Sequence, residues 1–251
     1  MLQLIPRPIY YQIRRLFLGS YYRLIHFNYD HLLFAPKKQL CGGTVRSYEL
    51  YNRHGTDQML AEIHAYCSKD AVVYDIGANV GVYSLSLAVE APERTIIAFE
   101  PSPVVYEQLN KNISLNAVLN QVETRQCGVG DRTAVEPFYT STYTELSSFQ
   151  SEGATRWEAQ IAATEHVDIV TLDTFVKTNP QPDVIKIDVE GTEASVLRGG
   201  AETLTQHRPI VFIELHEDGL RSDTAEACRA LLYSYGYDIS ERSEYWICKP
   251  V

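Results

Sequence analysis

The sequence lacks the features that mark disulfide-rich and zinc-binding proteins. Its 251 residues include only five cysteines, which are widely scattered and form no C-x-x-C motif. Closely spaced cysteines are the usual sign of a disulfide framework or of a structural zinc site. We therefore expect free thiols, a reducing, cytoplasmic setting and no metal site.

A long apolar run is also missing. No stretch reaches the roughly 20 apolar residues that a membrane-spanning helix requires. In the segment IYYQIRRLFLGSYYRLIHF, arginines interrupt the apolar residues and also exclude a signal-peptide core. We expect residues 1–45 to form a basic, aromatic, helical extension. It either lies on an anionic membrane as a peripheral contact or packs on the body or on a second subunit of a homo-oligomer.

Positive charge is scarce outside this extension. Residues 1–46 contain seven basic residues and one acid, a charge of +6, so the net charge of −10 leaves −16 on the remaining residues. Contacts to phosphates dominate nucleic-acid affinity, and an acidic body disfavours them. We expect a small-molecule or glycan partner and no nucleic acid.

From residue 56 onward, segments of helical periodicity alternate with short apolar segments, which predicts a parallel sheet with helices. Thr56 or Asp57 is expected to cap the first of these helices. A Ser-, Thr- and Tyr-rich stretch at 132–166 interrupts the alternation and contains a predicted polar helix. The predicted helices are 56–68, 77–91, 104–116, 154–164, 192–200 and 225–237, and the predicted strands are 71–77, 95–100, 122–130, 167–176, 183–191, 209–216 and 244–251.

A glycine-containing turn separates the first predicted strand from its helix. It reads Asp75-Ile-Gly77-Ala-Asn79-Val-Gly81. Glycines permit a tight turn and a close approach to a ligand, and the following helix presents free N–H groups. Glu100 ends the next strand, where a carboxylate can accept hydrogen bonds from ribose hydroxyls. Asn79 replaces the middle glycine of a dinucleotide fingerprint, which favours a nucleoside carrying an amino acid over a diphosphate.

These segments resemble a known family. YDIGANVGVYSLSLA, AFEPSP, IKIDVEGTEASVLRGG and FIELH occur in the order found in the FkbM-type methyltransferases, a class I S-adenosylmethionine-dependent group. The resemblance covers roughly residues 55–250. It implies a Rossmann-like, doubly wound α/β fold with a seven-stranded, mostly parallel sheet, helices on both faces and one reversed strand near the C-terminus. The methyltransferase domain is accordingly expected at 46–251.

The resemblance also implies a set of residues that bind S-adenosyl-L-methionine. Glu100 would hold the ribose of this cofactor. The methionine portion would be lined by Asp75, Gly77, Asn79 and Gly81, the adenine would be flanked by Gln126 and Cys127, and Ala78 and Pro101 complete the set.

The fifth predicted strand places carboxylates at the ligand-binding edge of the sheet. Lys186, Asp188 and Glu190 share one face if the strand stays extended. Asp188 and Glu190 are therefore candidate catalytic residues, and the alternative is a structural ion pair with Lys186. His216, which follows the next strand, is a candidate general base or a structural histidine. An oxygen/nitrogen cation site made from these three candidates is a further possibility that the sequence does not show.

The family implies transfer of a methyl group, with O-methylation of natural products and sugars as its best-known activity. The sequence contains neither [DN]-P-P-[FYW] nor a Pro-Cys nucleophile. We expect a hydroxyl on a sugar, glycan or natural-product-like acceptor. Its cap would be formed by the serine- and aromatic-rich residues Tyr139, Tyr143, Ser147, Ser148 and Phe149, unless this stretch is a solvated loop. Three alternatives stay open: an N-methyltransferase, an NAD-dependent oxidoreductase and a non-catalytic cofactor-binding or scaffold protein.

Overall fold

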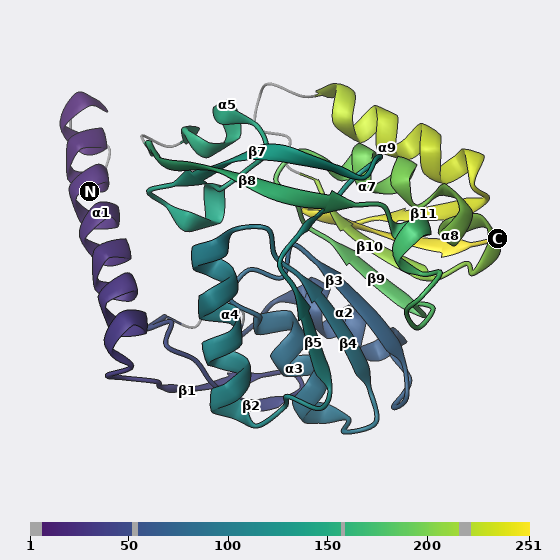
Figure 1. Cartoon of the computed structure of the whole chain (residues 1–251), viewed down its shortest axis with the longest axis horizontal. Coiled ribbons are helices and arrows are strands. Elements are labelled where there is room, and N and C mark those ends of the chain that lie inside the picture. Colours follow the sequence, from purple (N-terminus) through teal and green to yellow (C-terminus); the bar gives the residue numbers. More distant parts are fainter. Residues whose placement is uncertain (1–6, 52–54, 157–158, 216–221) are drawn as a thin grey trace.

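A computed structural model describes residues 7–51, 55–156, 159–215 and 222–251 (Figure 1). Helices and strands alternate along most of this chain. The helices are α1 (Arg7–His31), α2 (Gln58–Tyr66), α3 (Val82–Glu90), α4 (Pro103–Asn116), the 3-10 helix η2 (Thr144–Leu146), α5 (Ser151–Ala154), α6 (Leu172–Phe175), α7 (Glu193–Gly199), α8 (Ala201–Gln206) and α9 (Ser222–Ser234). The strands are β1 (Lys37–Leu40), β2 (Gly43–Arg46), β3 (Val72–Ile76), β4 (Thr95–Phe99), β5 (Val122–Arg125), β6 (Gly128–Val129), β7 (Ala134–Ser141), β8 (Ile161–Val170), β9 (Val184–Ile187), β10 (Ile210–Glu214), β11 (Tyr237–Glu241) and β12 (Tyr245–Pro250).

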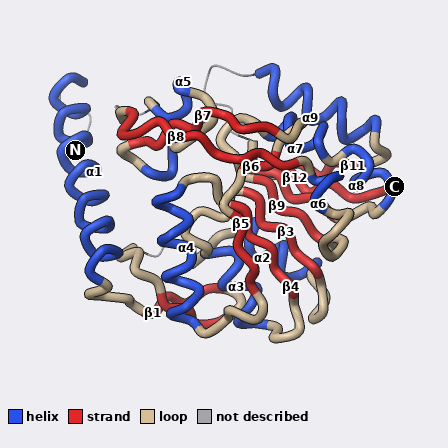
Figure 2. The backbone as a smooth tube through the Cα atoms, viewed as in Figure 1, coloured by secondary structure: helices blue, strands red, loops and turns tan. Residues whose placement is uncertain are grey.

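The main sheet has seven strands in the order β11-β12-β10-β9-β3-β4-β5 (Figure 2). Its central strands pair in parallel, and β12 runs antiparallel to both of its neighbours. The predicted fold class, including the reversed strand near the C-terminus, is confirmed. All the parallel strands therefore present their carboxyl ends at one edge, which is where open α/β sheets bind ligands.

Helices cover both faces of this sheet because successive residues of its strands point to opposite sides. Val73 of β3 packs in one core cluster with α2, α3 and α4, and the adjacent Tyr74 packs in a second cluster with α7, α8 and α9. Both side chains are fully buried. The central strands are thus apolar on both faces, which explains why they read as continuous apolar segments in the sequence.

Three predicted elements between residues 122 and 176 differ from the structure. The strand expected at 122–130 is divided, since β5 ends at Arg125 and β6 joins a separate sheet of order β6-β8-β7. The helix expected at 154–164 is wrong, because α5 ends at Ala154 and β8 begins at Ile161. The strand expected at 167–176 continues only to Val170, where Thr171 caps the short helix α6 by accepting a hydrogen bond from the Thr174 N–H.

The N-terminal part of the chain forms α1 and the antiparallel hairpin β1–β2, and the sequence did not predict this hairpin. Helix α1 stands at one edge of the molecule (Figure 1). Its second half packs on the body: the Tyr22 ring stacks on Tyr143 at 5.2 Å, and the buried Tyr29 hydroxyl accepts a hydrogen bond from Asn112.

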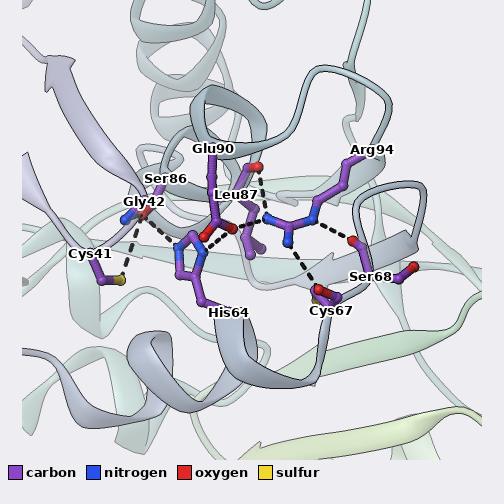
Figure 3. A network of polar contacts seen from close by, with 9 residues as sticks. All are labelled: Cys41, Gly42, His64, Cys67, Ser68, Ser86, Leu87, Glu90 and Arg94. Atoms are coloured by element: carbon purple, nitrogen blue, oxygen red, sulfur yellow. Dashed lines mark hydrogen bonds and ion pairs between the residues drawn. The ribbon is translucent and has the colours of Figure 1, made fainter.

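A polar network attaches the hairpin turn to α2 and α3 (Figure 3). His64 lies between Glu90, at 2.6 Å from Nδ1, and the Ser86 hydroxyl, at 2.9 Å from Nε2. The backbone N–H of Gly42 donates to the same hydroxyl. The sequence of groups matches a hydrolase triad, but Ser86 is fully buried, so the network serves to hold the hairpin.

Among the described residues, no helix is both long and apolar enough to cross a membrane. The five cysteines are free thiols, and Cys41 alone among them is exposed.

Candidate active site

A cavity of about 270 Å³ opens at the carboxyl edge of the main sheet. The loops that follow β3, β4 and β9 form its floor, and the end of β10 closes one side. Of the residues predicted from the sequence, those that line this cavity are Gly77, Ala78, Asn79, Glu100, Pro101, Cys127, Asp188 and Glu190. Asp75, Gly81 and Gln126 are not among the lining residues. Parallel strand ends thus bring together groups that are more than 100 positions apart in the chain.

The loop after β3 has the unusual backbone that its sequence predicts. Gly77, Asn79 and Gly81 have φ values of +76°, +51° and +87°. A Cβ atom on Gly77 would lie 1.8 Å from the Asp188 carbonyl oxygen, and one on Gly81 would lie 2.4 Å from Leu109 Cδ1. Within the protein, these glycines permit close packing against β9's loop and against α4. From the sequence we expected these glycines to let the backbone approach a ligand closely. In the structure, Gly77 also lets the loop after β3 pack closely against the loop after β9.

Glu100 lies at the end of β4 with both carboxylate oxygens in use. One oxygen accepts the Asn79 N–H at 3.0 Å and the other accepts the Ser102 N–H at 2.8 Å. Burial raises the pKa of Glu100 to about 7, because desolvation outweighs the stabilisation of the charge by these two N–H groups. The carboxylate is therefore fixed in orientation, and hydroxyl donors from a ligand would favour its charged form.

Lys186 is a buried cation between two acids. Its ammonium group donates to the Gly77 carbonyl at 2.7 Å and lies 3.2 Å from Asp75 and 3.5 Å from Asp188. Burial acts to lower the pKa of Lys186, but the Asp75 and Asp188 carboxylates outweigh it and hold this pKa above its ordinary value. Asp75, which the family resemblance places beside the methionine portion of the cofactor, pairs with Lys186 and accepts a hydrogen bond from Ser84.

Glu190 reaches the cavity by a different route from the one predicted. Strand β9 ends at Ile187, and Glu190 has a φ of +52°, so the extended strand that would place Glu190 beside Lys186 does not continue. The Glu190 carboxylate pairs with Arg156, and its backbone carbonyl accepts a hydrogen bond from Ser148. Asp188 is 30% exposed in its side chain and keeps the predicted position beside Lys186.

The third predicted catalytic residue, His216, lies outside the described residues. Within the described residues, no group of three or more His, Cys, Asp or Glu side chains is placed to hold a metal ion.

The Ser- and Tyr-rich stretch forms an ordered wall of the cavity. Ser147 and Phe149 line the cavity, and Phe149 packs over Gly128, where a Cβ atom would lie 2.5 Å from its ring. Tyr139 and Tyr143 do not line it, and Tyr143 is buried against Tyr22. The stretch is therefore packed structure and not a solvated loop.

Gln126 is exposed, whereas Cys127, the other residue expected beside the adenine, lines the cavity. Burial raises the pKa of the Cys127 thiol to about 11, so the group is a neutral, weakly polar surface. Such a surface suits contact with an aromatic base better than nucleophilic chemistry.

Sequence reasoning missed several lining residues. Glu214 ends β10 on the acidic side of the cavity, and Tyr83 on α3 donates its hydroxyl hydrogen to Asp57 at 2.7 Å. Lys38, Glu49 and Tyr51 contribute a wall from the N-terminal region. The position of Glu214 at the end of a predicted strand could have indicated that it lines the site. No sequence motif indicates the wall formed by the N-terminal residues.

The reversed strand and the cavity at the carboxyl edge define a Rossmann-like α/β protein of the methyltransferase class. The family assignment follows directly. Residues 75–239, about two thirds of the chain, match the family model described as the methyltransferase FkbM domain. The protein therefore belongs to the FkbM methyltransferase family. Membership implies that S-adenosylmethionine is the methyl donor.

Curated relatives and a solved structure agree with this assignment. Methyltransferase sdnD from Sordaria araneosa is 28% identical over 202 residues, covering 69% of this chain and 76% of the relative. The 31-O-demethyl-FK506 methyltransferase FkbM from Streptomyces tacrolimicus is 29% identical over 217 residues, covering 75% and 77%. Hexuronic acid methyltransferase AglP from Haloferax volcanii is 25% identical over 179 residues, covering 69% of each chain.

The crystal structure of methyltransferase FkbM from Methylobacillus flagellatus KT has a TM-score of 0.53 at 18% identity. The match covers 73% of this chain and 44% of that one, so this chain spans less than half of that protein. At this identity the likeness shows a shared fold.

Proposed function

We propose that the protein transfers a methyl group from S-adenosylmethionine to a hydroxyl of a sugar, glycan or natural-product-like acceptor. The observation that carries the proposal is Asp188, a partly exposed carboxylate at the floor of the cavity. The Lys186 ammonium group lies 3.5 Å from this carboxylate, and Gly77 packs closely against the Asp188 backbone carbonyl. The names of two relatives, a 31-O-demethyl-FK506 methyltransferase and a hexuronic acid methyltransferase, support acceptors of this class.

The residues present fit the methyl donor. Glu100 is oriented by two backbone N–H groups and is placed to accept hydrogen bonds from a ribose diol. The cavity is lined by five carboxylates, those of Glu49, Glu100, Asp188, Glu190 and Glu214, and by two lysines, Lys38 and Lys186. This excess of negative charge favours a cationic ligand. When bound, the donor supplies an electrophilic methyl group on a sulfonium centre.

The chain's own residues provide orientation and a proton acceptor. Asp188 accepts the proton of the acceptor hydroxyl, and Lys186 fixes the position of that carboxylate. Phe138 and Phe149 offer aromatic surface, and Thr144 and Ser147 offer hydroxyl groups, on the cavity wall formed by β7 and the residues that follow it. Aromatic faces together with hydroxyl partners suit a sugar ring. Positioning of the two reactants supplies most of the acceleration.

The test has two parts. Calorimetry on the wild-type protein should show tighter binding of S-adenosylhomocysteine than of NAD, and the reverse order would eliminate the methyltransferase assignment. Glycans, lipid-linked sugars and hydroxylated natural products are then screened with labelled donor, and the methylated atom of the product is identified by NMR. A methylated nitrogen would replace O-methylation with N-methylation.

Asp188→Asn separates the chemical role from a structural one. It keeps the shape of the side chain and removes its charge, so kcat should fall about 100-fold or more while donor affinity changes little. Asp238→Asn, at an exposed position on β11, is the matched control and should keep wild-type kcat. Normal turnover by a destabilised Asp188→Asn protein would show that Asp188 is only a partner of Lys186.

A further inference from the structure

Helix α1 carries a stripe of large apolar side chains that point away from the body. Leu16, Phe17, Leu24 and Phe27 are 51–72% exposed. Their spacing places them on the side opposite the buried residues, of which Ile25 is an example. Single exposed apolar residues are common, but four on one side of a helix form a patch of the kind that marks an interaction site.

The patch continues beyond the end of the helix. Leu32, Leu33 and Phe34 follow α1 directly and are 49–65% exposed. The exposed Phe27 ring also packs on His31 at a centroid distance of 4.2 Å. The apolar surface therefore extends along α1 from Leu16 onward and along the connection to β1, at the edge of the molecule seen in Figure 1.

The positive charge of this region favours an anionic partner. Residues 1–46 carry +6, whereas the rest of the chain carries −16. Arg23 and Lys37 are exposed beside the apolar residues. A symmetric contact between two copies would bring two basic, apolar stripes together, which like charges oppose. An anionic lipid surface attracts the basic segment, accepts the apolar side chains and repels the acidic body.

We propose that α1 and residues 32–34 form a peripheral membrane-binding surface for anionic bilayers. The apolar stripe enters the boundary between headgroups and acyl chains, and the exposed Arg23 and Lys37 contact the lipid headgroups. Because Tyr22 stacks on Tyr143, next to Thr144 of the cavity wall, binding in this way places that wall near the lipid surface. The proposal does not depend on the identity of the methyl acceptor.

Co-sedimentation of the full chain with vesicles tests the proposal. One set of vesicles contains phosphatidylcholine alone, and the other also contains phosphatidylglycerol. Wild-type protein should sediment with the anionic vesicles only, and high salt should weaken the binding. The variant Phe17→Ser/Leu24→Ser/Phe27→Ser should partition at least about tenfold less. The variant Arg23→Glu should partition onto the anionic vesicles about fivefold less or lower still, which is the scale of one surface charge near anionic lipid.

The matched control removes equally exposed apolar residues elsewhere. Leu119→Ser/Val135→Ser/Tyr233→Ser changes side chains that are 56–64% exposed and should partition like the wild type. Circular dichroism and affinity for S-adenosylhomocysteine verify that all variants are folded. Absence of wild-type binding, or equal binding by the α1 variant, would overturn the proposal. So would a wild-type dimer in sedimentation equilibrium that dissociates in the α1 variant, because the occupant would then be a second copy.

Discussion

The buried carboxyl of Glu100 makes ligand binding depend on pH. Its pKa is about 7, above the ordinary value of 4.5, because burial disfavours the charged form. A ligand whose hydroxyls donate to Glu100 needs that charged form. With a pKa of about 7, roughly one molecule in eleven carries the charge at pH 6 and roughly ten in eleven carry it at pH 8. Affinity for S-adenosylhomocysteine should therefore fall about tenfold from pH 8 to pH 6.

The same shift has a defined sign for stability. A carboxyl whose pKa is raised by folding binds more protons in the native state than in the unfolded state. Between pH 4.5 and about 7, the contribution of Glu100 to the stability of the ligand-free protein therefore decreases as pH rises. A bound ligand removes this penalty, so the increase in Tm on adding S-adenosylhomocysteine should be greater at pH 8 than at pH 6.

Calorimetry across this pH range with two variants tests the prediction. Glu100→Gln cannot titrate, so it should lose the tenfold pH dependence. Its affinity should also be lower, because glutamine offers one acceptor oxygen where the Asn79 and Ser102 N–H groups need two. Glu93→Gln changes an exposed glutamate before β4 and should keep the wild-type dependence. A flat wild-type profile, or the same slope in Glu100→Gln, would refute the role of Glu100.

Two further predictions concern stability and use urea unfolding. Lys186→Met leaves Asp75 as an unpaired buried charge and should lower the free energy of unfolding by about 3–5 kcal/mol, whereas Asp75→Asn/Lys186→Met should recover most of it. A small loss in the single variant would show that the pair is not needed for folding. Gly77→Ala forces a Cβ atom into the Asp188 carbonyl at a positive φ and should cost about 2 kcal/mol or more. The control Gly19→Ala, in a helix with open space around it, should be neutral or stabilising, and equal effects at the two sites would contradict the packing explanation.

The main sheet is predictable from the sequence because its central strands are apolar on both faces. TIIAF in β4 is an example, and the helix that follows it begins with the cap residue Ser102 and Pro103. The smaller sheet is not predictable in this way. Strand β8 is largely exposed along its length, so it shows no apolar alternation, and it forms because it pairs with β7. Distant pairing of this kind leaves no local signal.

The floor of the site is predictable for the same reason, and the rest is not. Strand ends place Gly77, Glu100 and Asp188 at one edge, and each falls in a recognisable motif. The partner of Asp75 lies 111 positions away, and pairing with Lys186 becomes visible only when β3 and β9 are known to be neighbours. Arg156, which lies just after α5, forms an ion pair with Glu190, although the sequence there predicts only a polar helix.

The contact between Gly77 and the Asp188 carbonyl has a consequence for changing what the protein accepts. The two loops touch without room for a methyl group, so the floor behaves as a single rigid part that substitutions cannot remodel piece by piece. The walls come from separate segments, the N-terminal hairpin region and the stretch between β7 and β8. An engineer seeking a new acceptor should therefore exchange those two walls and leave the floor intact.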